Sequence, residues 1–533
     1  MNCSTRFKLT TVALLVGSAM NANAALYKVY EYSPENDVET HGVAIQPSDK
    51  DCWNGECTEA EFSIAVETKK LKEGFNYRDE SPFFSPVGFD WLSDGYDGFR
   101  QHYCYRYLRY QDILCDNWSL EEWKGYSYEL DGNYDNSIAY QNDTPISAEN
   151  TVVNSLFVNG SNVVSIGNYR DGNNAIRNVA FFGDQVLKLP TANESGLPGS
   201  QDEIQSHGWS STNEGGNTYV VGSISRKYDG NSYTSKAAVW INNEPKLIDW
   251  DGAGVRDSLR PQGSSRDITV IDGEIFAVGY NSDSDERLRG AIFKSADNGA
   301  TWKSTFVGGF PYGVEYYLNS TLYSVNKNKI SVGTSKLSEA RNGSYSNSLF
   351  YVDDITSPNY NSFSGGIFFD GANGTVGAIN NFNEVVGSID AETHREYDGK
   401  PRAKRGFITT IDLPGKDPSR EERLGFKAWY LDDLTNGLED NNKYRVIDAT
   451  DVNDSGVISG TAQLCKEGFS SSSHNATCSG DITLVAVKLI PISGATNDDI
   501  KPRSFEKEKV ERSGAGVGCL SLTLLVLFGF RRK

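Results

Sequence analysis

A short segment that ends in glycine recurs six times along this chain at a nearly constant spacing. The repeat glycines are Gly167, Gly222, Gly279, Gly333, Gly387 and Gly460, so the steps between them are 55, 57, 54, 54 and 73 residues. An apolar run rich in β-branched residues precedes each glycine, and a polar loop and a second apolar run follow it. Apolar runs separated by Gly, Asp, Asn and Ser clusters predict strands joined by turns. A repeat of this length predicts an array of small β-meanders.

The clearest unit, residues 266–306, has room for four short strands in about 40 residues, the size of one propeller blade. Residues 41–84 read as a degenerate first copy, which brings the number of copies to seven. We therefore predict an all-β, propeller-like body over residues 25–491, with seven blades of four-stranded meanders. A strand over residues 26–32 would pair with the last blade and close the ring, because closure removes exposed sheet edges.

Two insertions interrupt the repeats. Residues 89–135 are dense in aromatic side chains, and the part from 99 to 123 lacks Gly and Pro, so it can be helical. Its aromatic residues form either a small core of the insertion's own or a platform for a carbohydrate or a protein partner. The second insertion, residues 412–445, contains the charged run 417–423, which predicts a solvated loop.

Both ends of the chain resemble targeting segments. Residues 1–24 have basic residues, then an apolar run, then small residues before a cleavage site between Ala24 and Ala25, the order typical of a secretory signal. Residues 492–512 read as a polar linker. Residues 513–533 combine small residues, an apolar stretch just long enough for a transmembrane helix, and a basic end that would stay cytoplasmic.

Export to an oxidising compartment would account for the cysteines. Six of the eight fall into near pairs, and fifteen pairings are possible, but the simplest joins neighbours on short loops. We predict the disulfides Cys52–Cys57, Cys104–Cys115 and Cys465–Cys478. Cys519 would remain unpaired in the tail. A zinc site is disfavoured, because no pair has the two-residue Cys-x-x-Cys spacing and the chain has only five histidines.

The net charge excludes some classes of partner. The whole chain carries 51 Lys and Arg against 71 Asp and Glu, a net charge of −20. Without the signal and the residues from 517 onward, five basic residues are lost (51 − 5 = 46), and the net charge is 46 − 71 = −25. Such a surface repels nucleic acid and anionic lipid, so we expect neither as a partner.

Two local motifs need an interpretation. Ser295, Asp297, Gly299, Thr301 and Trp302 match the Asp-box of β-hairpin turns at every fixed position. Asp297 can accept hydrogen bonds from turn amides and Gly299 can take a positive φ, so we interpret the box as a structural turn. Sialidases carry several such boxes, but this chain has a single copy and no arginine-triad signature, which argues against that enzyme.

The second motif begins at Asp451. Asp451, Asn453, Ser455 and Gly456 open like a calcium-binding loop, but position twelve is Ala462 where a glutamate is needed. The strand-turn-strand of the repeat explains the same residues. We expect no cofactor, with calcium at this loop as the one alternative.

The tail, with Gly514, Ala515 and Gly516 before its apolar stretch, resembles the GlyGly-CTERM sorting signal of Gram-negative bacteria. The resemblance implies processing near these residues by a rhombosortase-like protease, after an inner-membrane stage and before release to the cell surface or medium. Residues 378–388 and 451–460 resemble HAF-type extracellular repeats. As a whole, the chain resembles a family of exported proteins of marine gamma-proteobacteria, a domain of unknown function with no established activity.

Two functional classes remain. The favoured one is a non-catalytic surface or secreted protein that binds an extracellular glycan or protein, and the rival is a hydrolase of extracellular glycans on a propeller scaffold. No His-Glu-x-x-His, Gly-x-Ser-x-Gly or P-loop motif is present, and no catalytic residue can be named. Paired carboxylates in a central channel would favour the enzyme.

Overall fold

The computed structural model describes residues 25–506 apart from 36–37, 75–93, 148, 173–175, 200–202, 231, 256–259, 397–399 and 413–417. The signal sequence, the processing residues 514–516 and the apolar tail therefore lie outside the described residues. The described part is mostly β-structure, which confirms the all-β prediction. None of its helices is long and apolar enough to span a membrane.

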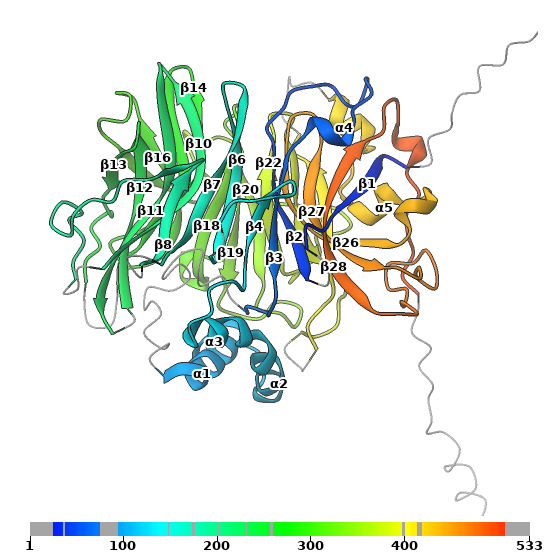
Figure 1. Cartoon of the computed structure of the whole chain (residues 1–533), viewed down its shortest axis with the longest axis horizontal. Coiled ribbons are helices and arrows are strands. Elements are labelled where there is room, and N and C mark those ends of the chain that lie inside the picture. The colour runs from blue at the N-terminus through cyan, green and yellow to red at the C-terminus, as the bar shows by residue number, and fades with distance from the viewer. Residues whose placement is uncertain are drawn as a thin grey trace, which may run out of the picture.

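The strands form seven four-stranded antiparallel units in chain order, shown in Figure 1. Unit 1 consists of β2 (Glu39–Ile45), β3 (Ile64–Lys69), β4 (Ala139–Gln141) and β5 (Thr144–Pro145), and unit 2 consists of β6 (Thr151–Asn159), β7 (Asn162–Asp171), β8 (Ile176–Phe182) and β9 (Gln185–Val186). Unit 3 consists of β10 (Ile204–Glu214), β11 (Asn217–Asp229), β12 (Ser232–Ile241) and β13 (Glu244–Ile248). Unit 4 consists of β14 (Gly263–Ile271), β15 (Glu274–Ser282), β16 (Leu288–Ser295) and β17 (Lys303–Phe306). Unit 5 consists of β18 (Tyr317–Val325), β19 (Ser331–Leu337), β20 (Asn347–Val352) and β21 (Asn361–Ser362), and unit 6 consists of β22 (Gly374–Ile379), β23 (Glu384–Asp390), β24 (Lys404–Thr410) and β25 (Trp429–Tyr430). Unit 7 consists of β26 (Tyr444–Val452), β27 (Ile458–Cys465) and β28 (Ile482–Pro491) together with β1 (Tyr27–Tyr32). A single parallel pair between β16 and β18 joins units 4 and 5 into one eight-stranded sheet.

The first strands of the units contact one another in an unbroken cycle. β2 contacts β6, and the contacts continue through β10, β14, β18 and β22 to β26, which contacts β2 again. The strand β1, from the start of the described chain, pairs antiparallel with β28 over residues 27–32, as predicted. Unit 7 is thus completed by the N-terminal strand, which ties the two ends of the body together.

The hydrophobic core is divided among the junctions between successive units. Tyr219 and Phe293 lie in one apolar cluster between units 3 and 4, and Phe276 and Phe350 lie in another between units 4 and 5. Corresponding clusters fill the other five junctions, including the one between units 7 and 1. Each unit therefore depends on both neighbours for burial of its apolar faces.

Every first strand contains a β-bulge at the middle of its pairing with the second strand. In units 2 to 7 the residue opposite the bulge is the repeat glycine. A Cβ at Gly279 would lie 2.0 Å from the carbonyl oxygen of Ser264, and one at Gly222 would lie 1.8 Å from that of His207. The glycine recurs because the bulged backbone leaves no space for a side chain.

The aromatic insertion is helical, as expected, and consists of α1 (Gly95–Gly98), the π-helix η3 (Phe99–Leu108), α2 (Asp112–Glu122) and α3 (Lys124–Leu130). Phe99 and Tyr103 are buried at the centre of its own cluster. The Trp118 ring stacks on Phe99 at a centroid distance of 5.6 Å, and the Trp123 ring is tilted against Phe99 at 5.2 Å. The interpretation of these aromatic residues as a small core of the insertion's own is confirmed. Figure 1 shows the helices grouped at one end of the strands.

The three disulfides join the predicted pairs: Cys52–Cys57, Cys104–Cys115 and Cys465–Cys478. One ties η3 to α2 within the insertion, and another closes the loop between β27 and β28. Each short loop of this kind is worth roughly 2–3 kcal/mol on a chain-entropy estimate.

The second insertion differs from the expected solvated loop. It contains α4 (Ser419–Arg423), β25, α5 (Leu431–Thr435) and the 3-10 helix η5 (Glu439–Asn441). Arg420, from the charged run, is buried because its guanidinium lies 3.1 Å from the Glu384 carboxylate and donates to the Asp454 carbonyl. The prediction of a solvated run was wrong at this residue, since the partners of a charge are not visible in local sequence.

The described chain ends against unit 7. The Arg503 amide donates to Asp433 Oδ1 at 2.6 Å, and its guanidinium donates to the Asp432 carbonyl and to Ser472 in the disulfide-bonded loop. The Phe505 ring stacks on His474 of the same loop at 4.7 Å. Residues up to 506 are therefore packed on the body.

We predict that Gly279→Ala lowers the free energy of unfolding by about 1–3 kcal/mol, because the added methyl group meets the Ser264 carbonyl at the bulge. Gly254→Ala is the control, since a Cβ there meets nothing within 4 Å. Denaturant titration of both variants measures the difference. Equal stability of the two would contradict this explanation of the repeat glycine.

Candidate functional site

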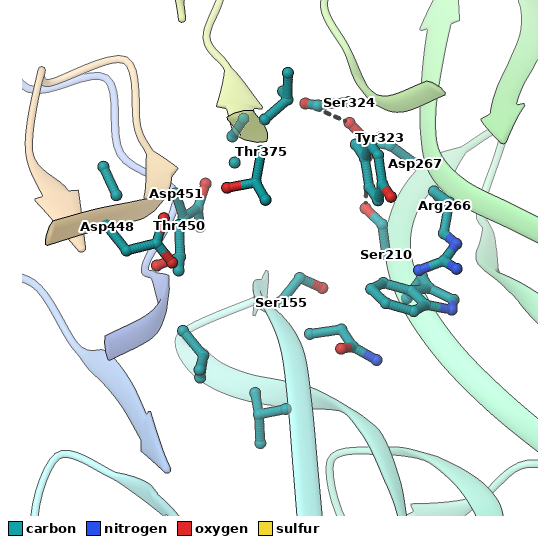
Figure 2. Close-up of a pocket in the computed structure, with 18 of the residues that line it drawn as sticks. Ser155, Ser210, Arg266, Asp267, Tyr323, Ser324, Thr375, Asp448, Thr450 and Asp451 are labelled. Atoms are coloured by element: carbon teal, nitrogen blue, oxygen red, sulfur yellow. Dashed lines mark hydrogen bonds between the residues drawn. The ribbon is translucent and has the colours of Figure 1, made fainter. Parts of the chain in front are cut away.

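The first strands of all seven units surround one cavity of about 680 Å³. Sites for small ligands typically have volumes of about 300–1,000 Å³. Figure 2 shows side chains from several units converging on this space. A cavity bounded by seven hydrogen-bonded strands has rigid walls, as a preformed ligand site requires.

The bulges determine which side chains face the cavity. A bulge leaves one residue unpaired and turns its side chain away from the regular alternation. The residues at the seven bulges all line the cavity: Val43, Asn154, Trp209, Arg266, Tyr323, the pair Gly377 and Ala378, and Thr450. The cavity therefore receives a different chemical group from nearly every unit.

One wall of the cavity is aromatic and cationic. The Arg266 guanidinium lies 3.7 Å from the centre of the Trp209 indole and 5.7 Å from that of the Tyr323 ring. Such stacking holds the planar guanidinium in one orientation. Figure 2 shows Arg266 and Tyr323 on the side of the cavity opposite Asp448, Thr450 and Asp451.

Asp267, on the cavity wall, accepts four hydrogen bonds. Its Oδ1 accepts from Ser210 Oγ of unit 3 and from the amide of Ile268, both at 2.8 Å. Its Oδ2 accepts from Ser324 Oγ at 3.0 Å and from the Val325 amide at 2.9 Å, both of unit 5. Burial raises the pKa of Asp267, and these donors oppose that shift. The side chain connects three successive units.

Asp451 has the equivalent role between units 7 and 1. Its Oδ2 accepts from the Ile45 amide at 2.9 Å, and its Oδ1 accepts from the Val452 amide at 2.8 Å. Burial raises the pKa of Asp451 to about 6 and also raises that of Asp448. Burial likewise lowers the pKa of His41, on the same side, to about 3, so the imidazole is neutral at physiological pH.

A series of asparagines connects the turns between first and second strands. Asn326 donates to the carbonyl of Asn380 at 2.9 Å, Asn380 donates to that of Asn453 at 3.0 Å, and Asn453 donates to that of Gln46 at 2.9 Å. The Oδ1 of Asn380 also accepts two amides of its own turn. These asparagines, which include those of the motif at 451–456, thus join unit 5 to units 6, 7 and 1.

The residues of the calcium-like loop take part in this connection. Asp451 accepts the Ile45 amide of β2, and Asn453 donates to the carbonyl of Gln46, the residue after β2. Ser455 Oγ donates to Ser48 Oγ at 2.9 Å. Within the described chain, the group of His, Cys, Asp and Glu atoms close enough to share a metal ion is Cys465, Glu467 and Cys478. Its two sulfur atoms are bonded to each other, so they are not thiolate ligands.

The aromatic insertion spans one mouth of the cavity. On one side, Glu129 of α3 lies 2.9 Å from Arg177 of unit 2. On the other, Asn319 of unit 5 donates to the Tyr107 hydroxyl at 3.4 Å, and the Tyr110 hydroxyl donates to Glu396 at 3.2 Å. Tyr103, Tyr107 and Leu108 line the cavity from this end. The insertion thus has its own core and also contributes to the candidate site.

The Asp-box lies at the turn between β16 and β17, and its residues do not line the cavity. Asp297 accepts from the Thr301 hydroxyl at 2.6 Å and amide at 2.9 Å, and from Ser295 Oγ at 2.8 Å. These bonds lower the pKa of Asp297 to about 2. Gly299 has a φ of 84°, and Trp302 Nε1 donates to its carbonyl at 3.1 Å.

Sequence reasoning did not identify the cavity residues. A usable signal exists, because the bulge residue precedes the repeat glycine by 13 residues in units 2 to 4 and by 9 or 10 in units 5 to 7. This offset is visible only once the bulge is known.

The fold and the cavity define an all-β protein of seven repeated sheet units around a central candidate binding site. Residues 263–533 match the family profile described as "Protein of unknown function (DUF3466)", and the chain belongs to this family. No curated protein shows a significant match to this chain.

Several solved structures resemble it weakly. A protein of unknown function from Dyadobacter fermentans is 11% identical, with 87% of this chain and 98% of that chain covered and a TM-score of 0.33. A Trypanosoma rangeli sialidase in complex with the inhibitor DANA is 8% identical (64% and 54% covered, TM-score 0.32). The GH32 beta-fructofuranosidase of Bombyx mori is 13% identical (48% and 60% covered, TM-score 0.25). The chain thus spans little more than half of either enzyme, and TM-scores below 0.5 assign it neither fold nor activity.

We predict that Asp267→Asn lowers the free energy of unfolding by about 2–3 kcal/mol at pH 7, because an amide nitrogen replaces one acceptor oxygen and leaves two buried donors without a partner. Asp272→Asn, in the exposed β14–β15 turn, makes the same change of charge and should leave stability nearly unchanged. Denaturant unfolding compares them. An undiminished stability of Asp267→Asn would mean that this carboxylate is free for chemistry.

Proposed function

We propose that residues 25–491 form a seven-bladed β-propeller whose central cavity binds an extracellular ligand without transforming it. The cycle of contacts among the first strands and the pairing of β1 with β28 support the architecture. The observation that carries the function is the convergence of seven bulges on one cavity whose mouth is spanned by the insertion. A protein partner could insert only a side chain or a short segment there, so a small ligand such as a glycan end is the better fit.

The hydrogen bonding of the carboxylates favours binding over catalysis. A glycoside hydrolase needs two carboxyl groups free to act on substrate, about 5–10 Å apart. Asp267 and Asp451 instead accept backbone amides that hold neighbouring units together. The rival hydrolase reading is supported by the raised pKa of Asp448 and Asp451, since a general acid must stay protonated near neutral pH.

A cavity-filling variant tests the binding function. We predict that Ser155→Phe, on the cavity wall, abolishes the thermal stabilisation of the full-length protein by whichever members of a panel of oligosaccharides, amino acids and inorganic ions stabilise the wild type. Ser472→Phe, exposed in the disulfide-bonded loop, should respond like the wild type. Release of reducing sugar during incubation would favour the hydrolase, and stabilisation that persists in Ser155→Phe would place binding elsewhere.

We further propose that the protein is exported and that its tail tethers the precursor to the inner membrane. A rhombosortase-like protease then removes the tail and leaves the body at the cell surface or in the medium. The HAF-like motifs, the signal-like N-terminus and the GlyGly-CTERM-like tail support this location. Three disulfides are also typical of an oxidising compartment.

The termini of the mature protein test this location. We predict that mass spectrometry of surface and culture fractions finds chains that begin at Ala25 and end near residues 514–516. The apolar stretch after residue 516 should be missing from them, since cleavage needs the locally unwound peptide that glycine favours. Intact chains ending in Lys533, confined to the inner membrane, would instead indicate a permanent anchor.

A further inference from the structure

We propose that the central cavity takes the end of a neutral saccharide, with the sugar's hydroxyl groups bonded to the bulge residues and its apolar face against the aromatic insertion. This inference rests on the proposed binding function of the cavity and specifies the class of ligand.

A comparison of the repeats separates residues that hold the ring together from residues that face the ligand. The position after the bulge recurs as a short polar side chain, as at Ser210, Asp267, Ser324 and Asp451, and in units 4, 5 and 7 it accepts an amide of the next unit. The bulge position itself differs in every unit: it is an amide, an indole, a guanidinium, a phenol or a hydroxyl in five units and apolar in units 1 and 6. A position that is not repeated in a repeated framework is free to be adapted to a ligand.

The cavity presents these polar groups from all sides. Asn154, Arg266, Tyr323, Thr375 and Thr450 come from five different units around the circumference. Figure 2 shows Arg266, Tyr323, Thr375 and Thr450 at separate points around the space. A pyranose ring carries hydroxyl groups around its edge, so it can bond in many directions at once. An elongated apolar ligand would leave the Ser155 and Ser211 hydroxyls and the Trp209 indole N–H, which have no hydrogen-bond partner in the described chain, buried and unbonded, at a cost of about 1–3 kcal/mol each.

Aromatic rings complete the match. Tyr103 and Tyr107 line the closed end of the cavity, and their rings stack at a centroid distance of 5.5 Å. Trp209 and Tyr323 lie on the wall. The two faces of a sugar ring consist largely of C–H bonds, which pack favourably on aromatic surface. The Tyr103 ring itself is stacked between Phe99 and Tyr107, so the sugar would contact the parts of these side chains that border the cavity.

The charges argue against other small ligands. Glu67, Asp267, Asp448 and Asp451 face the cavity with Lys69 and Arg266, so carboxylates outnumber cations and repel phosphate or a nucleotide. A calcium ion would compete with the backbone amides that already bind Asp267 and Asp451. Carboxylates and a guanidinium on opposite walls form strong charge-assisted hydrogen bonds to neutral hydroxyl groups.

Calorimetric titration of the full-length protein in detergent tests the inference. The probes are neutral tetrasaccharides of β-linked glucose and of N-acetylglucosamine. Glutamate, inorganic phosphate and calcium chloride are titrated separately as representatives of other ligand classes. We expect at least one tetrasaccharide to bind, and we expect Asp448→Asn and Tyr323→Phe each to weaken it about tenfold or more, the loss of one hydrogen bond to a charged or buried group. Asp272→Asn and Tyr312→Phe, both at exposed residues, should change the affinity less than twofold.

Each other result has a distinct meaning. Binding of glutamate, phosphate or calcium that Ser155→Phe abolishes, without saccharide binding, overturns the saccharide assignment and leaves the binding function standing. Saccharide binding that is unaffected by Asp448→Asn, Tyr323→Phe and Ser155→Phe overturns the cavity as its site. Failure of every probe to bind a folded protein overturns both proposals.

Discussion

The close approach between each bulged first strand and the repeat glycine beside it is the contact on which the rest of this structure depends. At Gly279 the backbone of the neighbouring strand occupies the position that any Cβ would take. The bulge is sterically compatible only with glycine at this position, and the bulge turns a residue of each unit toward the central cavity. Unit 1 differs: Val66 stands opposite its bulge, and a Cβ at Gly42 in the first strand would lie 2.4 Å from the carbonyl oxygen of Gly460 in unit 7. One backbone device thus specifies both the sheet geometry and the cavity.

The ring of units is held by polar side chains as well as by apolar junctions. Asp267 and Asp451 accept amides of the next unit, and Asn326, Asn380 and Asn453 donate to the next turn. Apolar packing is tolerant of small displacements, whereas hydrogen bonds fix the register of neighbouring strands. A carboxylate used in this way is poorly placed to be a nucleophile or a general base, because its oxygen atoms already bind donors that would lose their partners.

The sequence predicted the elements whose signals are local. The period of the apolar runs predicted seven four-stranded units, the alternation at residues 26–32 predicted the strand that pairs with β28, and the cysteine spacing predicted three disulfides. It could not predict the cavity residues, because a bulge shifts the register by one residue and reverses which side chains face inward. Arg420 was misjudged for a related reason: its partner Glu384 lies 36 residues away in the chain.

The aromatic insertion forms a core of its own and also borders the candidate site. Its apolar rings bury one another, so the segment needs no help from the body to form a core. Its charged and phenolic groups, Glu129 and Tyr110 among them, attach it to opposite sides of the ring. These contacts hold the insertion over one end of the cavity from two sides. For the ligand that we propose, hydrogen bonds to these enclosed walls would form at lower local dielectric than at an open surface, so each would discriminate more strongly.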